Sequence, residues 1–456
     1  MRNRNIIGLV IACALLVGCG GTTDKNTPSD NDGGPISVPS FSGKADNYVS
    51  SNAREFELTG TIRANLPDNF SELEGQERED AITEAVDSRL STVTQTLKDH
   101  VKSRVDEANS GSGDGESKYF MYARSDNEKT LERTVTDQGR VEVKFEWELV
   151  GSKDLVQVLV SEGAGSRSFE IEVEGSGDQE TVTRTIDVAP SPSDDAFPKY
   201  DELFADGVYD IGLHIGGDYN EQRYDIEIAK WTVDRLVSDG WNNPEVDSYE
   251  DLTIDSPPFT KTMTLEGREI EARVYVYHPE MAGSNQERLS KKMKESFANR
   301  DVVIYNGHSG PGAGFILDYH PRHEIKPSEF SDLEFADKYQ IFAFNGCETY
   351  RTYVPDIMGS TDKTFENLDI VTTVNKTPIS SGYQVTYQFV NWLTMTDQQG
   401  RHFPLTWNSM LQGINEGARA DAHYGVHGID QDPELNPHRN EGVACRSCDS
   451  QSQCQA

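Results

Sequence analysis

The sequence predicts two folded domains of different class, an α+β domain with a largely antiparallel sheet and then an α/β domain with a mostly parallel sheet. Three observations support this. The chain has 456 residues, more than one ordinary domain contains. Residues 54–188 combine one long amphipathic helix with short strand-like segments separated by glycine, serine and aspartate. From residue 200 onward, apolar strands alternate with helices, an order typical of a parallel sheet.

The first domain is predicted over residues 52–190, and its opening segment, residues 54–62, has the composition of a strand. Apolar side chains then recur every three or four positions along one stripe of a long helix: Ile82, Val86, Leu90, Val93, Leu97, Val101 and Val105. Further strands are expected at residues 118–123, 140–150, 154–160, 168–174 and 181–188. This domain contains no catalytic pattern, so we expect it to be an accessory domain, followed by a linker at residues 191–199.

The second domain is predicted over residues 200–430. Strands are expected at residues 208–215, 272–278, 301–305, 339–344 and 368–374, and helices at residues 223–241, 287–300, 326–338 and 383–395. Parallel strands need right-handed crossover connections, so helices should cover both faces of the sheet. In such sheets ligands bind beyond the carboxyl ends of the strands. Functional residues are therefore expected just after these strands.

The N-terminus has the features of an export signal. A basic start precedes an apolar run from Ile6 to Val17, which is too short for a permanent membrane-spanning helix. The tetrapeptide LVGC, ending at Cys19, resembles the lipobox of bacterial lipoproteins, in which the cysteine becomes the lipidated first residue. We expect a signal peptide at residues 1–18, membrane attachment through lipid at Cys19, and a flexible polar tether at residues 19–51. The alternative is an ordinary cleaved signal with an incidental cysteine. The glycine after Cys19 favours the outer membrane if the cell is Gram-negative.

The charge of the chain excludes one class of partner. The sequence has 77 acidic and 42 basic residues, which gives a formal charge of −35. Such a charge repels nucleic acids and anionic lipid surfaces. No nucleic-acid partner is therefore expected, and the charge suits a well-solvated exported protein.

Cysteine usage sets one residue apart from the others. Cys13 lies in the signal and Cys19 in the lipobox, while three more crowd the C-terminal tail at residues 431–456: Cys445, Cys448 and Cys454. In an exported protein a disulfide between two of these three is expected, although their C-x-x-C spacing also fits a zinc or redox site. Cys347 alone lies in the body of the chain. A solitary cysteine in an oxidising compartment needs a specific reason.

His308 is the expected partner of Cys347. The apolar strand at residues 301–305 leads to this glycine-flanked histidine, and the next strand along the chain leads to Cys347. If the two strands are parallel neighbours, both side chains emerge at the same edge of the sheet. An imidazole beside a thiol favours the thiolate that attacks a carbonyl, and it supplies a proton to the leaving amine. The glycines let backbone N–H groups approach an oxyanion, and we expect those of Cys347 and of Ser309 or Gly310 to do so.

This pattern resembles the caspase-like cysteine peptidases of clan CD, which include caspases, legumains, gingipains, separases and the CHAT proteases. The resemblance lies in an apolar strand ending in His-Ser-Gly and a second one ending in a small residue and Cys. It covers roughly residues 200–395, and the Cys-Glu-Thr at Cys347 is most similar to the CHAT branch. It implies a caspase-like sheet between helices, and an endopeptidase whose His308/Cys347 dyad cleaves protein or peptide substrates without a cofactor. Ser309 and Gly346 depart from the glycine and alanine that the family often has.

The same resemblance implies three substrate-binding residues. The residue two before the nucleophile often lines the primary specificity pocket, which indicates Asn345. Arg223 lies in the loop where caspases and legumains carry a basic residue, and a pocket arginine would favour an acidic or amide side chain. Asp218 lies in the same loop and would instead favour arginine or lysine. An exposed loop arginine is the alternative for Arg223.

Three other functions fit parts of the sequence. Ser309 lies in a near match to the G-x-S-x-G of serine hydrolases, although proline replaces the last glycine and no helix can begin directly after the serine. A metal ion could bind two sets of side chains, the first being Asp318, His320 and His323, and the second His438 with the tail cysteines. The chain could also be a binding or scaffold protein that keeps a peptidase fold without activity.

Overall fold

A computed structural model describes residues 48–428, apart from residues 111–117, 124–128, 137–138, 161–166, 175–180, 192–194, 311, 361 and 418–421. All the described residues belong to one compact unit. The expected signal peptide, the lipidation site Cys19, most of the tether and the tail at residues 431–456 lie outside the described residues. Within the described part, no helix combines the length and the apolar character that crossing a membrane requires.

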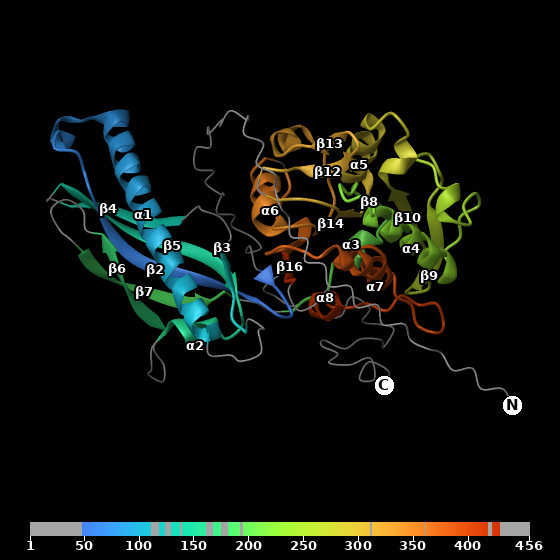
Figure 1. Cartoon of the computed structure of the whole chain (residues 1–456), viewed down its shortest axis with the longest axis horizontal. Coiled ribbons are helices and arrows are strands. Elements are labelled where there is room, and N and C mark those ends of the chain that lie inside the picture. Colours follow the sequence, from blue (N-terminus) through green and yellow to red (C-terminus); the bar gives the residue numbers. More distant parts are fainter. Residues whose placement is uncertain are drawn as a thin grey trace. The chain divides into compact units, whose positions relative to one another are not determined.

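An eight-stranded sheet organises the C-terminal half of the chain (Figure 1), and its strands lie in the order β1, β16, β15, β14, β11, β8, β10, β9. Neighbours from β15 to β10 are parallel, whereas β9, β16 and β1 pair antiparallel at the two edges. The expected α/β class with a largely parallel sheet is therefore confirmed. The strands are β1 (Tyr48–Val49), β8 (Val208–Ile215), β9 (Phe259–Leu265), β10 (Arg268–Tyr277), β11 (Val302–Asn306), β14 (Gln340–Asn345), β15 (Leu368–Thr373) and β16 (Tyr424–His427).

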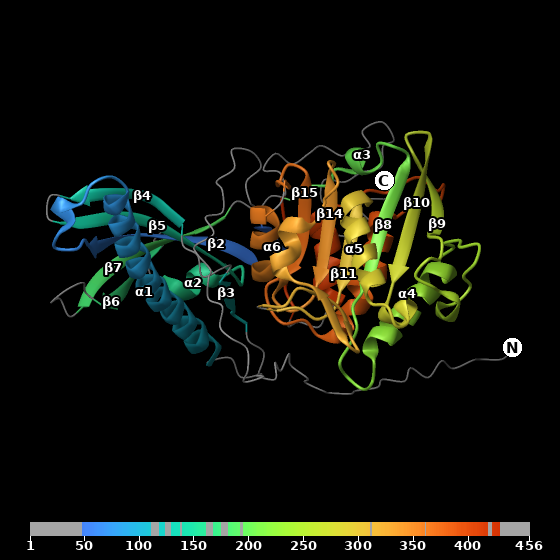
Figure 2. The same ribbon diagram turned by 90° about the horizontal axis from the view of Figure 1, so that it is seen from above.

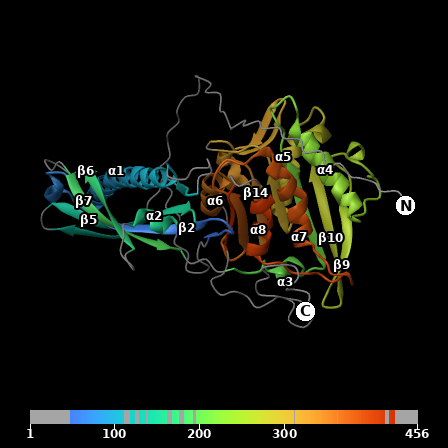
Figure 3. The same ribbon diagram turned by 60° about the horizontal axis from the view of Figure 1, so that its bottom comes forward.

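Helices cover both faces of this sheet, because successive side chains of a strand point to opposite faces. In β11, Val302 and Ile304 belong to one hydrophobic core, whereas Val303 and Tyr305 belong to another. Figure 2 shows α5 and α6 over the second core, and Figure 3 shows α7 and α8 over the first, which α4 also covers. The helices are α4 (Tyr224–Ser238), α5 (Glu287–Asn299), α6 (Thr349–Ser360), α7 (Phe389–Leu393) and α8 (Trp407–Gly417). Burial on both faces explains why these strands are almost continuously apolar.

The prediction of a crossover helix at residues 326–338 is wrong. Residues 326–338 form only a short 3₁₀ turn at Pro327–Asp332, which follows a hairpin of β12 (Phe315–Tyr319) and β13 (Arg322–Ile325). Within the turn only Phe330 is buried. The segment therefore lacks the apolar stripe that holds a surface helix against a core.

The predicted tether extends too far. Tyr48 and Val49 form β1 and pair antiparallel with β16 at the edge of the large sheet. Tyr48 is fully buried, and its ring lies so close to Gly425 that a Cβ atom there would come within 2.1 Å of it. Residues 48–51 therefore belong to the folded part of the chain and not to the predicted tether. A strand of two residues in a polar sequence carries too little periodicity to be predicted.

A smaller antiparallel sheet and one long helix form the N-terminal part. The strands lie in the order β3, β5, β2, β7, β6, and β4 also pairs with β5. The helix α1 (Gly75–Ser110) buries all the residues of its predicted apolar stripe in a core separate from those of the large sheet. The strands are β2 (Arg54–Asn65), β3 (Met121–Ala123), β4 (Lys129–Thr136), β5 (Arg140–Gly151), β6 (Ser168–Glu174) and β7 (Thr181–Pro190).

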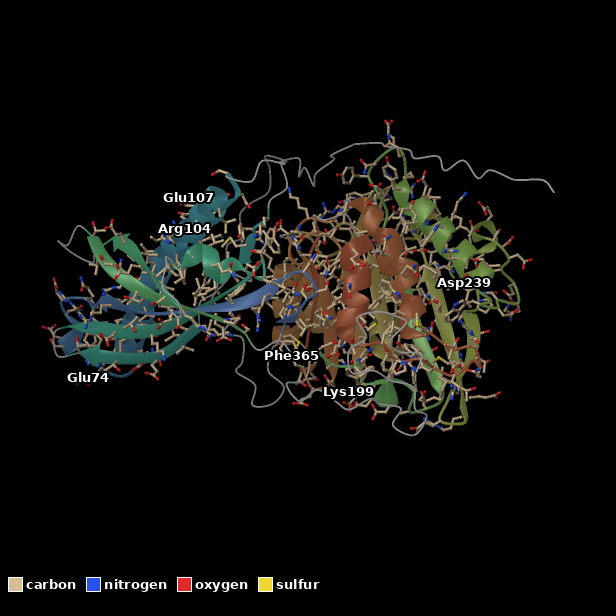
Figure 4. The ribbon with its side chains drawn as sticks, turned by 90° about the horizontal axis from the view of Figure 1, so that it is seen from below. Glu74, Arg104, Glu107, Lys199, Asp239 and Phe365 are labelled. Atoms are coloured by element: carbon tan, nitrogen blue, oxygen red, sulfur yellow. The ribbon has the colours of Figure 1, made fainter. Side chains whose placement is uncertain are left out.

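The strand expected at residues 154–160 is a short helix, α2 (Leu155–Leu159). Its buried side chains, Leu155, Val158 and Leu159, are spaced by three and four positions, which is the helical and not the strand period. Arg104 of α1, labelled in Figure 4, donates a hydrogen bond of 3.1 Å from Nη2 to the carbonyl oxygen of Val158. The remaining short helix, α3 (Tyr200–Leu203), precedes β8.

The two sheets meet where β1 leads into β2. The hydroxyl of Tyr350, in the first turn of α6, donates a hydrogen bond of 2.7 Å to Glu55 Oε1 on β2. Close by along the sheet edge, the rings of Phe120 and His423 stack with centroids 3.8 Å apart. Tyr48 and Tyr350 belong to one apolar cluster that joins residues of both sheets. The small sheet therefore contacts the start of the helix that follows Cys347.

Candidate active site

Three neighbouring parallel strands carry the candidate residues to one edge of the large sheet. The strand β11 lies between β8 and β14, so Asn306 pairs with Ile215 on one side and with Asn345 on the other. The chain continues from these three paired positions, within two or three residues, to His308, Asp218 and Cys347. The strand register thus brings a carboxylate, an imidazole and a sulfur to the same edge.

Gly346 is required by the close approach of the loops after β11 and β14. A Cβ atom at Gly346 would lie 2.3 Å from Ser309 Oγ and 2.8 Å from the carbonyl oxygen of Gly307. Ser309 Oγ in turn donates a hydrogen bond of 2.8 Å to the carbonyl oxygen of Cys347. The two loops are therefore fastened to each other, and the alanine that the resembling family often has would not fit without a shift.

His308 is paired with a buried carboxylate. Its Nε2 atom lies 3.1 Å from Asp218 Oδ1, and Asp218 is 2% exposed whereas the histidine side chain is 22% exposed. Burial opposes the ionisation of Asp218, but hydrogen bonds from His308 and Asn220 outweigh it, so the pKa of Asp218 lies below its ordinary value. An ionised Asp218 holds Nε2 as the donor. Nδ1 is then the ring nitrogen left for proton transfer.

This pairing gives Asp218 a different place from the one expected. Its Oδ1 also accepts hydrogen bonds from the backbone N–H and the side-chain amide of Asn220, at 3.1 Å and 2.7 Å. Its Oδ2 is buried, and no hydrogen-bond partner for it occurs among the described residues. Asp218 therefore orients His308 and does not line an open pocket for arginine or lysine.

Cys347 is disulfide-bonded and not the solitary thiol that the sequence suggested. It is 5% exposed. The five other cysteines all lie outside the described residues: Cys13, Cys19, Cys445, Cys448 and Cys454. A sulfur in a disulfide cannot act as a nucleophile.

The residues expected to form the oxyanion hole lie in two turns with unusual backbone conformations. Gly310 has φ of +152°, a value that side-chain-bearing residues avoid. Glu348, directly after Cys347, has φ of +56°, and its N–H donates a hydrogen bond of 3.0 Å to the carbonyl oxygen of Asn375. A left-handed residue at this point turns the chain sharply from β14 into α6. The backbone around Cys347 is thus held in place by neighbouring loops.

Asn345 is placed in the protein interior. It is 4% exposed, and its Oδ1 accepts hydrogen bonds from Tyr424, at 2.6 Å, and from Ser381, at 3.2 Å. Its amide nitrogen donates to Asn306 on the neighbouring strand. All parts of this side chain serve contacts within the fold, so we assign it no role in binding substrate.

Arg223 lies at the start of α4, in the left-handed conformation. Its Nε and Nη2 form a forked hydrogen bond with both carboxylate oxygens of Asp225, at 2.9 Å and 2.8 Å, and its Nη1 pairs with Glu280. Burial opposes the ionisation of Asp225, but hydrogen bonds from His278 and Arg223 outweigh this effect and lower the pKa of Asp225 to about 2. The guanidinium expected in a specificity pocket is therefore already neutralised by two acidic side chains.

The alternative sites are placed as follows. Ser309 uses its hydroxyl proton in the bond to the carbonyl oxygen of Cys347, an orientation unsuited to a nucleophile. Asp318 accepts from the backbone N–H of His320, and His323 contacts Ser290. Over the described ranges, no cluster of three or more His, Cys, Asp or Glu side chains is arranged to hold a metal ion. His438 lies outside the described residues.

Two tyrosines at the site were not predicted. Tyr219 and Tyr319 have rings whose centroids lie 4.7 Å and 5.4 Å from that of His308. Tyr219 directly follows Asp218 beyond the end of β8, so the sequence could have indicated it as a site residue. Tyr319 lies on the β12–β13 hairpin, which was not predicted from the sequence.

A scan of known protein families and a search of curated proteins both found no match to this chain.

Proposed function

We propose that this chain is a cysteine endopeptidase, exported and attached to a membrane through lipid at Cys19, and that the disulfide at Cys347 keeps it latent. The observation that carries the proposal is the arrival of Asp218, His308 and Cys347 from three adjacent parallel strands, with His308 bonded to Asp218 at 3.1 Å. A parallel sheet between two helical layers, with its site at the carboxyl edge, also supports the resemblance to caspase-like peptidases.

The chemistry follows from the two reacting side chains. The Cys347 thiol gives its proton to Nδ1 of His308, and the resulting thiolate attacks the scissile carbonyl carbon, forming a carbon–sulfur bond while the carbonyl π electrons move to the oxygen. His308, oriented by Asp218, gives its proton to the nitrogen of the leaving amine as the carbon–nitrogen bond breaks. Water then attacks the resulting thioester, with His308 now accepting a proton, and the thiolate is released. Backbone N–H groups beside Gly310 and Cys347 are proposed to stabilise the oxyanion.

Activity requires that the disulfide at Cys347 be reduced first. A dithiol reductant supplies two electrons and two protons, closes into its own disulfide, and leaves Cys347 and its partner as thiols. The proposed enzyme is therefore inactive when oxidised and active after reduction.

The test is peptide-bond cleavage by the mature soluble region, without its lipid anchor, before and after treatment with dithiothreitol. Cleavage of a peptide library is expected only after reduction. The Cys347→Ala variant should lose it, and the His308→Ala variant should lose roughly 10²- to 10⁴-fold, the usual contribution of a general acid. The matched control is Ser309→Ala, which should retain cysteine-dependent cleavage. Activity that survives Cys347→Ala but not Ser309→Ala would instead identify a serine hydrolase.

One observation favours a second candidate function. Because Cys347 is disulfide-bonded, the chain could be a catalytically silent binding or scaffold lipoprotein in which that bond is purely structural. A scaffold would bind its partner equally well in every variant of the site. It would also show no cleavage at any redox state.

A further inference from the structure

We propose that Tyr219 and Tyr319 form an aromatic subsite for the substrate residue that follows the scissile bond, and that it accepts an aromatic or large aliphatic side chain. This inference deepens the proposed function and rests on it. The two tyrosine rings and the ring of His308 make up this aromatic subsite.

The three rings contact one another. The Tyr219 and His308 centroids lie 4.7 Å apart with a 35° angle between the ring planes. Tyr319 meets His308 edge-on, at 5.4 Å and 86°, and meets Tyr219 edge-on, at 5.4 Å and 75°. Such edge-to-face contacts are favourable between aromatic rings, so they fix the orientation of each ring.

The close packing of the loop after β8 against β12 brings the two tyrosines together. A Cβ atom at Gly216 would lie 2.2 Å from the carbonyl oxygen of Ile316, so only glycine lets the loop after β8 pass so close to β12. Tyr219 and Tyr319 both lie three residues beyond these contacting positions. The pair of rings is therefore built by the packing of two different loops.

The aromatic subsite is open to solvent. Tyr219 is 41% exposed, one of few large apolar side chains in the described residues to be so exposed, and His308 and Tyr319 are partly exposed. A single exposed tyrosine needs no explanation by itself. Tyr219 differs because its exposed ring lies against the histidine that is proposed to protonate the leaving group.

The charges around the aromatic subsite already have partners. Asp218 pairs with His308, and Arg322, whose guanidinium lies 5.9 Å from the Tyr319 ring centre, pairs with Glu324 at 3.1 Å. Asp318 accepts a hydrogen bond from Gln286 at 3.3 Å. Since Asp218, Asp318 and Arg322 are each engaged by a neighbour within the fold, the surface offered to a ligand is chiefly aromatic, which selects apolar rings and aliphatic chains over ions.

The chemistry of cleavage identifies which substrate residue reaches this surface. His308 must lie beside the leaving nitrogen to protonate it. That nitrogen belongs to the residue after the scissile bond, so the side chain of this residue emerges next to the rings that pack on His308. The subsite therefore selects on the leaving-group side of the substrate.

The test uses reduced protein and peptides that differ only at the residue after the scissile bond: phenylalanine, leucine, alanine, arginine or aspartate. We expect kcat/KM for the phenylalanine and leucine peptides to exceed that for the alanine peptide by about tenfold, a typical discrimination by an apolar pocket. The Tyr219→Ala variant should reduce this ratio to near one, whereas Tyr219→Phe should keep it. The matched control is Leu131→Ala, which removes a similarly exposed side chain on β4 and should leave the ratio unchanged.

Other outcomes would overturn the inference in recognisable ways. Cleavage with no dependence on this residue, or a preference for arginine, removes the aromatic subsite but leaves the peptidase intact. An equal loss on all peptides in Tyr219→Ala, with a changed pH profile, shows that the ring only positions His308. If no peptide is cleaved, the proposed function fails. The subsite is then decided by binding of the same peptides to Cys347→Ala protein, where equal affinity for phenylalanine and alanine peptides contradicts it.

Discussion

We propose that Asp218 acts only through His308, because its buried side chain lies 3.1 Å from His308 Nε2. We expect Asp218→Asn to lower kcat/KM of the reduced protein roughly ten- to a hundredfold, as loss of an orienting partner usually does. The pH dependence of cleavage should also change, since the negative charge that stabilises an imidazolium is gone. The matched control is Asp318→Asn, which changes another buried carboxylate on the neighbouring hairpin. It should alter kcat/KM by less than about threefold. Equal losses in both variants would show a general disturbance and not a positioning role.

At the same scale, the residues of the site differ in how well the sequence predicts them. The position of His308 and Cys347 at one edge of the sheet was predictable because each follows an apolar strand. The contacts of Asn345 with Tyr424 and of Arg223 with Asp225 could not be predicted from the sequence. From the sequence alone, a polar side chain that is free to bind a ligand cannot be distinguished from one that only makes contacts within the fold.

At the scale of elements, the turn between β14 and α6 makes a specific prediction. Gly346→Ala should lower the free energy of unfolding by about 1–3 kcal/mol, the usual cost of forcing extra atoms into a packed site. The reason is that a Cβ atom at position 346 would lie 2.3 Å from Ser309 Oγ and 2.8 Å from the carbonyl oxygen of Gly307. Denaturant unfolding measures the change, and Gly346→Ala combined with Ser309→Ala should recover part of it. Wild-type stability in the single variant would contradict the close approach of the two loops.

The edge strand β1 makes a second prediction at this scale. Tyr48 is fully buried between β16 and the start of α6, so Tyr48→Ala should cost about 3–5 kcal/mol, as deletion of a large buried ring does. Tyr219→Ala is the control, because removing an exposed ring usually changes stability by less than about 0.5 kcal/mol. Urea midpoints of the two variants give the comparison. Equal, small effects would mean that β1 is not part of the folded sheet.

Elements with long, regular patterns were predictable, and short ones were not. The apolar stripe of α1 and the buried strands β8, β11, β14 and β15 carry enough periodic positions to be identified from sequence alone. The β12–β13 hairpin and β1 are short, and their pairing depends on tertiary contacts, which a sequence pattern does not show. The same limit explains α2, where five residues with apolar side chains fit a strand as well as a helix.

At the scale of the whole molecule, Glu55 joins the small sheet to α6 through the hydroxyl of Tyr350. Burial raises the pKa of Glu55 well above its ordinary value, and nearby Glu148 adds to the rise. Because the folded pKa is the higher one, stability is fully present below the ordinary carboxyl pKa and is lost as pH rises toward the folded value.

Glu55→Gln should therefore stabilise the protein at pH 8 and change its stability little at pH 4. The difference should grow with pH by at most about 1.4 kcal/mol per pH unit. Thermal or urea unfolding at both pH values measures it. The exposed Glu170→Gln on β6 serves as control and should show no such divergence. Parallel stability curves for wild type and Glu55→Gln would contradict a buried, protonated Glu55.

The most direct test of the central claim is the rate at which an iodoacetamide probe labels Cys347, measured from pH 5 to 9 before and after reduction, with the labelled residue identified by mass spectrometry. We expect no labelling of Cys347 in the oxidised protein. After reduction we expect fast labelling of Cys347 at acidic pH, which slows in His308→Ala. If reduced Cys347 labels no faster than an ordinary free thiol, and His308→Ala makes no difference, then the sulfur is not activated and the peptidase account is wrong.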